Sequence, residues 1–395
     1  MSRTIKISGA GCALVDYLYK PVNFHSEAIA PYLSAKAGDG GLSPGRLVFT
    51  EELERFASED YPAIRTKIVN GQEPVALNIG GPSIVSLIHA AQLLHDLPAE
   101  VCFWGCKGND SGAAFLDEKL QKTPLKVGKY KTGTLYTPFT DVFSDPDFDR
   151  GNGERIFVNN IGAAGELRPE DLDESFFNAD IVVFGGTAIV PEIHNHLTEL
   201  LQTARNKGCI TIVNTVYDFR NEKTNPEKRW PLGKSDKSYL LTDLLITDYE
   251  EALRLSGKHN IQAAIRFFQE KQVGSLVITN GSKNIHAWSS GQFFGKLDLT
   301  ELPVSAEVAQ QIKCGTCGDT TGCGDNFAGG VLASLVMQLN AGVPTPDLKE
   351  ACYWGIVSGG YTCFYFGGTY FEAFPGEKFQ KLKPYYERYK QQLAD

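Results

Sequence analysis

Asp319-Thr320-Thr321-Gly322-Cys323-Gly324-Asp325 is the stretch that decides the fold class and the chemistry expected of this chain. An apolar pattern with the spacing of one helical face follows it: Phe327, Val331, Leu332, Leu335, Val336 and Leu339. Residues 322–325 therefore form a first helical turn, whose N–H groups have no partner inside the helix. Gly322 and Gly324 carry no side chain that would obstruct a ligand. Free N–H groups at the positive end of a helix dipole predict an anion site.

A carboxylate stands in the same turn as these N–H groups. Asp325 would cap the helix, and it could equally accept a proton from a hydroxyl group brought up to the bound anion. An anion site beside a base is the minimum apparatus for moving a phosphoryl group onto an alcohol. A capped helix without chemistry is the alternative interpretation. A second acid at Asp319, with glycines on both sides of Cys323, favours the catalytic one.

The stretch resembles the C-terminal signature of the ribokinase-like (PfkB) carbohydrate kinases, in which the usual pattern is D-T-x-G-A-G-D. Cys323 takes the place of the usual Ala, a small-for-small change that leaves the backbone site intact. The resemblance implies ATP-dependent transfer of the γ-phosphoryl group to a sugar hydroxyl, with Asp325 as the base. It also implies an anion hole made by the N–H groups of Gly322, Cys323 and Gly324. Mg²⁺ is the expected metal cofactor beside ATP, and the resemblance leaves room for K⁺.

The composition narrows the classes of partner. The 395 residues carry a formal net charge of −9 and no block of Lys or Arg, so nucleic acid is not an expected partner. The sequence has no secretory apolar region and no run of about 18 apolar residues, so a membrane is not expected either. The nine cysteines are an odd number scattered through a long chain, as is typical of reduced thiols. We therefore expect a cytoplasmic protein.

Alternating apolar segments predict the architecture. Apolar strands at 181–184, 209–213, 244–246 and 275–279 are separated by helical patterns such as 192–207. Such runs indicate a parallel sheet that helices cover on both faces. With the resemblance, we expect a three-layer α/β/α ribokinase-like fold with a central, mostly parallel sheet and a smaller β-rich lid.

The lid is expected from a Thr- and aromatic-rich segment, 133–143, and from residues 155–158 beyond a turn, which together predict a hairpin. We expect residues 1–16, 77–132 and 161–395 to form the kinase core. Residues 17–76 and 133–160 are then lid and insertion. Lids in the resembled family often pair between subunits, so a homodimer is expected.

Two features point to the side that would bind the phosphoryl acceptor. Asp16 follows the first strand, and its carboxylate can accept two O–H groups at once. An Asp at this point binds two sugar hydroxyls in the resembled family, whereas a turn or cap residue is the alternative. Gly80 and Gly81 precede an apolar helix and resemble the substrate-binding G-G-x-x-x-N-x-A motif. Its Asn position is Val85 here, which leaves the identity of the substrate open.

Polar residues at the ends of later strands point to the nucleotide side, because ligands of parallel sheets gather at the carboxyl ends of strands. Asp248 and Glu251 resemble the family's N-x-x-E motif, in which the Glu orients water on Mg²⁺ rather than binding the ion directly. Acidic residues at a helix start are the alternative. Thr279 and Gly281 resemble a V-T-x-G turn near the nucleotide, and Asn214 is expected near the phosphates.

Other interpretations remain open. An adenosine-type nucleoside kinase would share every phosphate-side residue and differ only in its acceptor pocket. A non-catalytic relative that binds a metabolite is a further alternative, against which the intact Asp325 argues. No G-x-x-x-x-G-K-[ST] pattern occurs, which excludes a P-loop, and Leu14 holds the place of the third glycine of a dinucleotide fingerprint. The sequence of residues 20–76 indicates no particular function for this segment.

Overall fold

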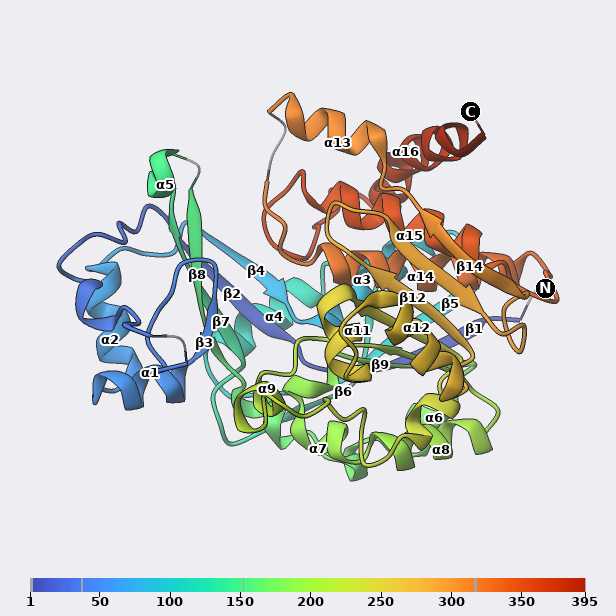
Figure 1. Cartoon of the computed structure of the whole chain (residues 1–395), viewed down its shortest axis with the longest axis horizontal. Helices are drawn as coiled ribbons and strands as arrows, with labels where there is room; N and C mark the ends of the chain where they lie inside the picture. Colours follow the sequence, from blue (N-terminus) through green and yellow to red (C-terminus); the bar gives the residue numbers. More distant parts are fainter. Residues whose placement is uncertain (1–2, 37, 152, 316–317, 395) are drawn as a thin grey trace.

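The computed structural model describes residues 3–36, 38–151, 153–315 and 318–394. Within these residues, nine strands form a central sheet in the order β14-β13-β12-β11-β10-β9-β1-β5-β6 (Figure 1). All neighbours from β12 to β6 are parallel, and β13 and β14 add an antiparallel edge. The strands are β1 (Ile5–Gly11), β5 (Ala99–Lys107), β6 (Lys126–Thr132), β9 (Ile181–Gly185), β10 (Ile210–Asn214), β11 (Leu244–Asp248), β12 (Ser275–Thr279), β13 (Ile285–Ser289) and β14 (Leu297–Leu302).

Helices cover both faces of this sheet, each over its own apolar core. One face is covered by α3 (Pro82–Leu93), α4 (Ser111–Leu120), α14 (Cys323–Asn340), α15 (Leu348–Thr362) and α16 (Glu377–Ala394). The other face carries α6 (Glu174–Phe177), α7 (Pro191–Asn195), α8 (Leu197–Asn206), α10 (Lys237–Leu240), α11 (Tyr249–Ser256) and α12 (Ile261–Glu270). The remaining helices named here are α5 (Phe148–Gly151), α9 (Phe219–Thr224) and α13 (Ala306–Lys313). This is the three-layer α/β/α arrangement that the alternating pattern predicts.

Local sequence explains why these elements form where they do. The strand expected at 275–279 is β12, and all five residues of β9 are buried, as a doubly covered parallel sheet requires. Side-chain caps start the helices: Asp110 accepts from the Ala113 N–H at 2.9 Å, and Asn260 accepts from the Ala263 N–H at 2.9 Å. The prediction of one helix over 192–207 is wrong in one respect: the helix breaks at His196, between α7 and α8.

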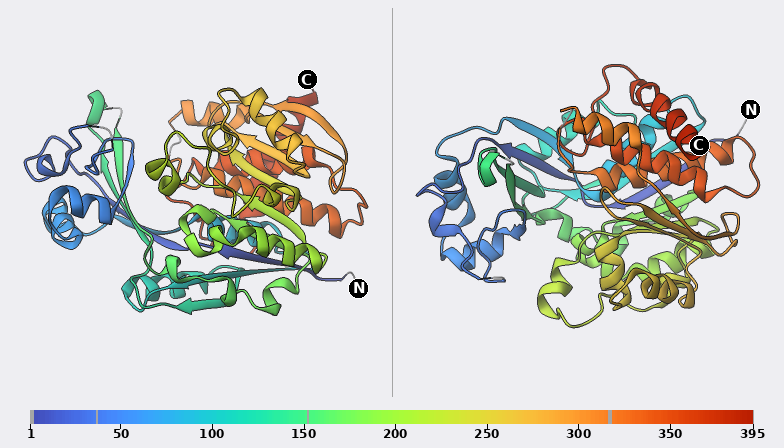
Figure 2. Two further views of the ribbon diagram at one scale, coloured as in Figure 1. Left: turned by 60° about the horizontal axis from the view of Figure 1, so that its bottom comes forward. Right: turned by 45° about the horizontal axis from the view of Figure 1, so that its top comes forward.

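A second sheet projects from one end of the core (Figure 2). Its five described strands follow the order β3-β8-β7-β2-β4, and β7 and β8 form the expected antiparallel hairpin. The strands are β2 (Leu14–Tyr19), β3 (Leu47–Phe49), β4 (Ala76–Gly80), β7 (Phe139–Asp145) and β8 (Glu154–Asn160). Helices α1 (Thr50–Ala57) and α2 (Tyr61–Val69) pack on one face of this lid sheet around a third apolar core. Residues 20–76 thus supply β3, α1 and α2.

The border between core and lid lies elsewhere than the sequence predicts. Residues 14–16 and 77–80, which the sequence assigns to the core, lie in β2 and β4 of the lid sheet. The pattern misses this border because only Cys12 and Ala13 separate β1 from β2 in one apolar run. Asp16 consequently lies within a strand, paired with Asn78 on one side and with Thr140 on the other. No helix among the described residues is long and apolar enough to span a membrane.

Gly329 sets the distance between α14 and α3. A Cβ added to this glycine would collide with the backbone oxygen of Ser86 and lie 2.9 Å from the Cβ of His89. We expect Gly329→Ala to lower the free energy of unfolding by about 1–3 kcal/mol, because backbone has to move. Gly165→Ala is the matched control, since its added Cβ would meet only the Ile161 side chain at 3.8 Å. Identical thermal midpoints for the two variants would contradict this close approach.

Candidate active site

The expected anion site lies at the beginning of α14. Gly322 is the N-cap residue, with a φ of +76°, a conformation that favours glycine. A Cβ on Gly322 would lie 2.5 Å from the Cα of Gly368, so the glycine is needed for space as well. The first turn of the helix is therefore pressed against the loop that contains Gly368.

The backbone N–H groups of this turn are mostly free. The N–H of Asn326 donates to the Gly322 carbonyl at 2.9 Å, and the N–H of Cys323 donates to the Thr320 carbonyl at a longer 3.3 Å. Among the described residues, the N–H groups of Gly322 and Gly324 have no protein acceptor. A Cβ on Gly324 would meet no atom within 4 Å. Two of the three expected donors thus lack a protein partner, Gly324 with open space beside it, and the third is held in a turn.

Carboxylates from two different segments meet beside this turn. Burial raises the pKa of Asp325 to about 6. Burial, followed by the charges of Asp319 and Asp325, raises the pKa of Asp16 to about 8. The Oδ2 of Asp16 is buried without a hydrogen-bond partner among the described residues. Strand β2 and helix α14 therefore bring the expected acceptor-binding carboxylate and the expected base into one electrostatic environment, as a shared substrate would require.

The side chain of Asn326 ties this turn to the rest of the fold. Its Nδ2 donates to the carbonyls of Gly322 and Gly368 at 2.9 and 2.8 Å. Its Oδ1 accepts from the Nζ of Lys378 at 3.0 Å, and the same ammonium donates to the Tyr365 hydroxyl at 2.8 Å. Lys378 is fully buried, and burial lowers its pKa well below the usual range. The sequence gives no signal for Lys378, whereas Asn326 stands next to Asp325 and could have been suspected.

Arg155, a residue of the lid, places its guanidinium beside the first turn of α14. It lies on β8, and its guanidinium donates to the hydroxyls of Thr320 and Thr321, each at 3.3 Å. It also lies 3.8 Å from the Oδ1 of Asp319. The sequence places Arg155 only in the lid hairpin. A guanidinium beside an anion site can add charge-assisted hydrogen bonds to the bound anion.

A cavity of about 310 Å³ opens next to these groups. Its polar lining includes Asp16, Asn78, Asp319 and Thr321. The rest is largely apolar and aromatic: Leu18, Leu77, Tyr365, Phe366, Tyr370 and Phe371. The cavity therefore combines two carboxylates with a largely apolar and aromatic lining.

The two glycines expected to bind substrate lie close to the segments around Asp16 rather than in the lining of this cavity. A Cβ on Gly80 would collide with the carboxylate of Asp16. Gly81 has a φ of +110°, and a Cβ on it would lie 2.6 Å from the Cys12 carbonyl oxygen. Both glycines therefore make room for Asp16 and for the passage from β1 to β2. Val85, at the family's Asn position, is buried.

Asn78, to which the sequence assigns no role, faces the same cavity from β4. Its Nδ2 donates to the carbonyls of Phe366 and Thr369 at 2.7 and 3.2 Å. This side chain fastens the lid sheet to the loop between α15 and α16. The polar residue opposite Asp16 is thus a link between two segments nearly 300 positions apart.

The expected nucleotide-side residues lie along one edge of the central sheet. Asn214 is level with Gly185 on β9 and with Ile246 on β11, and Asp248 is level with Thr279 on β12. Asn214 is 5% exposed, and its Oδ1 has no partner among the described residues. Gly281 has a φ of +55° and open space around its Cα. A buried, unpartnered acceptor at the carboxyl ends of parallel strands is suited to a ligand.

Asp248 and Glu251 form a reciprocal cap at the start of α11. The Oδ1 of Asp248 accepts the Glu251 N–H at 2.7 Å, and the Glu251 carboxylate accepts the Asp248 N–H at 3.3 Å. The Thr215 hydroxyl also donates to Glu251. Burial, then the charge of Asp248, raises the pKa of Glu251 to about 8. Asp248 and Glu251 therefore cap the helix, as the alternative interpretation expects. The Glu251 carboxylate nevertheless lies where the parallel strands end.

The described residues contain no group of three or more His, Cys, Asp or Glu side chains that could hold a metal ion directly. Mg²⁺ keeps several waters and commonly uses only one or two carboxylates together with phosphate oxygens. The unpartnered Oδ1 of Asn214 and the buried Glu251 fit such a water-mediated site.

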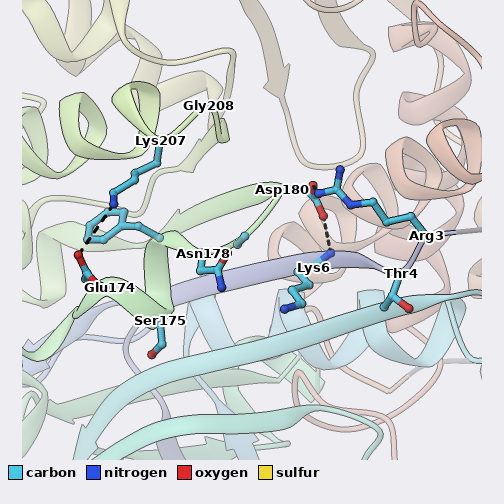
Figure 3. A pocket seen from close by; sticks show the side chains of 11 residues that line it. Arg3, Thr4, Lys6, Glu174, Ser175, Asn178, Asp180, Lys207 and Gly208 are labelled. Atoms are coloured by element: carbon cyan, nitrogen blue, oxygen red, sulfur yellow. Dashed lines mark hydrogen bonds and ion pairs between the residues drawn. The ribbon is translucent and has the colours of Figure 1, made fainter.

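A larger cavity, of about 660 Å³, lies at the opposite edge of the sheet (Figure 3). It is lined by Thr4, Asp180 and Gly208, which precede β1, β9 and β10. Asp180 pairs with Arg3 and accepts the Lys6 N–H at 2.9 Å. Lys207 and Glu174 form a second ion pair in its lining, and none of these residues is among the expected site residues.

Known proteins with similar sequences and folds identify the family of this chain. The curated inositol 3-kinase of Arabidopsis thaliana is 24% identical over 270 residues, which is 67% of this chain and 64% of the relative, less than two thirds of its length. The adenosine kinase of Schistosoma mansoni with 2-fluoroadenosine superposes with a TM-score of 0.69 at 14% identity, covering 92% of this chain and 96% of that one. The ribokinase of Giardia lamblia gives a TM-score of 0.66 at 15% identity, covering 96% and 99%. Both structures share the fold.

The model of the pfkB family carbohydrate kinases matches residues 52–372, a segment that includes the start of α14 and most of the second sheet. The chain therefore belongs to the pfkB family of carbohydrate kinases, which are phosphotransferases that act on an alcohol group.

Proposed function

We propose that this chain transfers the γ-phosphoryl group of ATP to a hydroxyl group of a sugar or a sugar-like polyol. One observation carries the proposal: the Asp325 carboxylate stands in the first turn of α14 beside the unpartnered N–H groups of Gly322 and Gly324. Asp16 supports it, because a buried carboxylate oxygen without a partner is suited to accept acceptor hydroxyls.

In the proposed reaction, Asp325 accepts the proton of the acceptor hydroxyl while the hydroxyl oxygen attacks the γ-phosphorus. The bond from this phosphorus to the bridging oxygen breaks, and ADP leaves with the electron pair. The N–H groups of Gly322 and Gly324 stabilise the charge of the transferred group, and Cys323 joins them if its turn bond opens. One such donor contributes roughly 3–4 kcal/mol in comparable sites. Arg155 adds a cation from the lid side.

On the nucleotide side, Asn214 and Glu251 would hold Mg²⁺ through water, with Asp248 positioning Glu251. When bound, the ion neutralises charge on the phosphate oxygens. Thr279 and Gly281 would lie along the nucleotide. A requirement for K⁺, a homodimer and a cytoplasmic location remain proposals from the sequence.

A nucleoside acceptor is the second candidate. The cavity beside Asp16 has an aromatic and apolar wall, and both Phe366, 52% exposed, and Leu77, 36% exposed, belong to it. A flat base would cover such a wall better than a small polyol does. Inositol is a third acceptor to test, because the curated relative is an inositol 3-kinase.

An acceptor panel separates these candidates. Ribose, fructose, myo-inositol and adenosine are each tested for an increase in thermal midpoint and for ADP release from MgATP. We expect turnover with a polyol, and a loss of the acceptor-induced shift in Asp16→Asn, because this variant lacks the carboxylate that accepts two hydroxyls. Turnover with adenosine alone would favour the nucleoside candidate. Stabilisation without any ADP release would favour the non-catalytic alternative.

Asp325→Asn tests the base. The amide keeps the shape of the side chain but cannot accept the proton, so we expect turnover to fall by roughly 10²–10⁴-fold with an unchanged thermal midpoint. Asp298→Asn, on an exposed position of the edge strand β14, is the matched control and should keep the wild-type rate. Near-wild-type turnover of Asp325→Asn would exclude this role.

The pH dependence of kcat/KM gives a second test of the base. Burial raises the pKa of Asp325 to about 6, and only the charged form accepts a proton. We therefore expect kcat/KM to rise with pH through about 6, and through a second limb near pH 8 where Asp16 becomes charged. The limb near pH 6 should persist in Asp16→Asn, whereas the limb near pH 8 should disappear in this variant. A flat profile in the wild type would contradict the assignment.

A further inference from the structure

We propose that Cys323 and Cys363 form a reversible oxidation site, in which a peroxide converts the two thiols into a disulfide that disables the anion hole. Their sulfur atoms lie 3.6 Å apart. Cys323 is the first residue of α14, and Cys363 is the C-cap residue of α15. The site itself does not depend on the reaction catalysed, whereas its effect on turnover rests on the proposed function.

The packing of α14 against α15 keeps the two sulfurs together. Glycines allow the helices to touch: a Cβ on Gly359 would lie 2.8 Å from the Cys323 carbonyl oxygen, and one on Gly330 would lie 2.7 Å from the Trp354 carbonyl oxygen. The backbones that carry the sulfurs therefore meet closely over several turns. Their proximity is a property of the helix pair, not of a loop.

Both thiols are also partly exposed, as an oxidant requires. Cys323 and Cys363 are intermediate in exposure, whereas Cys12, Cys209 and Cys352 are buried. The hydrogen bond between the two sulfurs lowers the pKa of Cys363 to about 7. The same contact, together with burial, raises the pKa of Cys323. Cys363 is thus the nucleophile of the pair, since the thiolate is the reactive form.

The chemistry balances with hydrogen peroxide as the oxidant. The Cys363 thiolate attacks one peroxide oxygen and the O–O bond breaks, which gives a sulfenic acid and hydroxide. The hydroxide takes up the proton that the Cys363 thiol released on ionising and leaves as water. The Cys323 sulfur then attacks the sulfur of that sulfenic acid. The S–O bond breaks, the Cys323 proton goes to the departing hydroxide, and a second water leaves. Two thiols lose two electrons and two protons, and one peroxide becomes two waters. A dithiol reverses the change.

The disulfide would distort the anion hole directly. The sulfurs must move from 3.6 Å to about 2 Å apart. Cys323 lies between Gly322 and Gly324, whose N–H groups are the proposed donors. A displacement of about 1 Å in such a site costs on the order of 10² in rate. An alanine at position 323, as in the usual family signature, would leave Cys363 without this partner.

The test uses the full chain, first reduced with dithiothreitol and then treated with hydrogen peroxide. We expect peptide mapping without reduction to find a Cys323–Cys363 cross-link and turnover to fall at least about tenfold. Both changes should reverse on renewed reduction. A cross-link with unchanged turnover, or turnover lost without this cross-link, would overturn the proposal.

Matched variants identify the cysteines. Cys363→Ser should keep the basal rate and resist peroxide, whereas Cys314→Ser, which removes an exposed thiol, should remain as sensitive as the wild type. Thermal midpoints show whether each variant is folded, and Cys363→Ala replaces the serine variant if that one is not. A Cys363 variant that is inactivated like the wild type, or a cross-link to Cys314 or Cys317 instead, would contradict the assignment.

The mapping also separates this proposal from the proposed function. A wild-type chain that turns over no acceptor contradicts the kinase proposal, while the presence or absence of the Cys323–Cys363 cross-link still decides the oxidation site.

Discussion

The hydrogen bonds of the Asn326 side chain are the constraint on which the candidate site depends. One amide group joins the N-cap carbonyl of α14, the carbonyl of Gly368 and the buried Nζ of Lys378. These groups come from three segments that are distant in sequence. A buried polar group of this kind is costly unless every partner is present, so the three segments are held in one arrangement. These hydrogen bonds therefore also hold the turn that carries the free N–H groups of Gly322 and Gly324.

The lid contributes chemistry as well as cover. Strand β2 carries Asp16 and β8 carries Arg155, so in the proposed reaction the lid would supply both an acceptor for hydroxyl groups and a donor near the phosphate. Asn78 on β4 bonds to the loop that follows α15. Closing such a lid over a bound acceptor removes water, which is the competing acceptor of a phosphoryl group. Core and lid are therefore two halves of one site.

Negative carboxylates and positive groups lie together around the start of α14. Asp16, Asp319 and Asp325 lie close enough that the pKa of Asp16 is raised by the other two after burial. A bound phosphate would add further negative charge. The positive end of the α14 dipole and the guanidinium of Arg155 are the features that offset it. The site is thus arranged to hold an anion and a proton acceptor together, which is the requirement of phosphoryl transfer to a hydroxyl.

The sequence by itself determined the features that depend on residues close together in the chain. The glycines and Asp325 at a helix start, the buried strand at 275–279 and the lid hairpin follow from residue type and spacing, and the structure has each of them. The family followed from the same short stretch. Only the tertiary structure decided that β2 and β4 belong to the second sheet and that Lys378, Arg155 and Asn78 lie at the candidate site. It also decided that Cys323 meets Cys363. The reason is physical: a helix start or a buried strand depends on neighbours a few residues away, whereas these contacts join segments separated by 40 to nearly 300 positions.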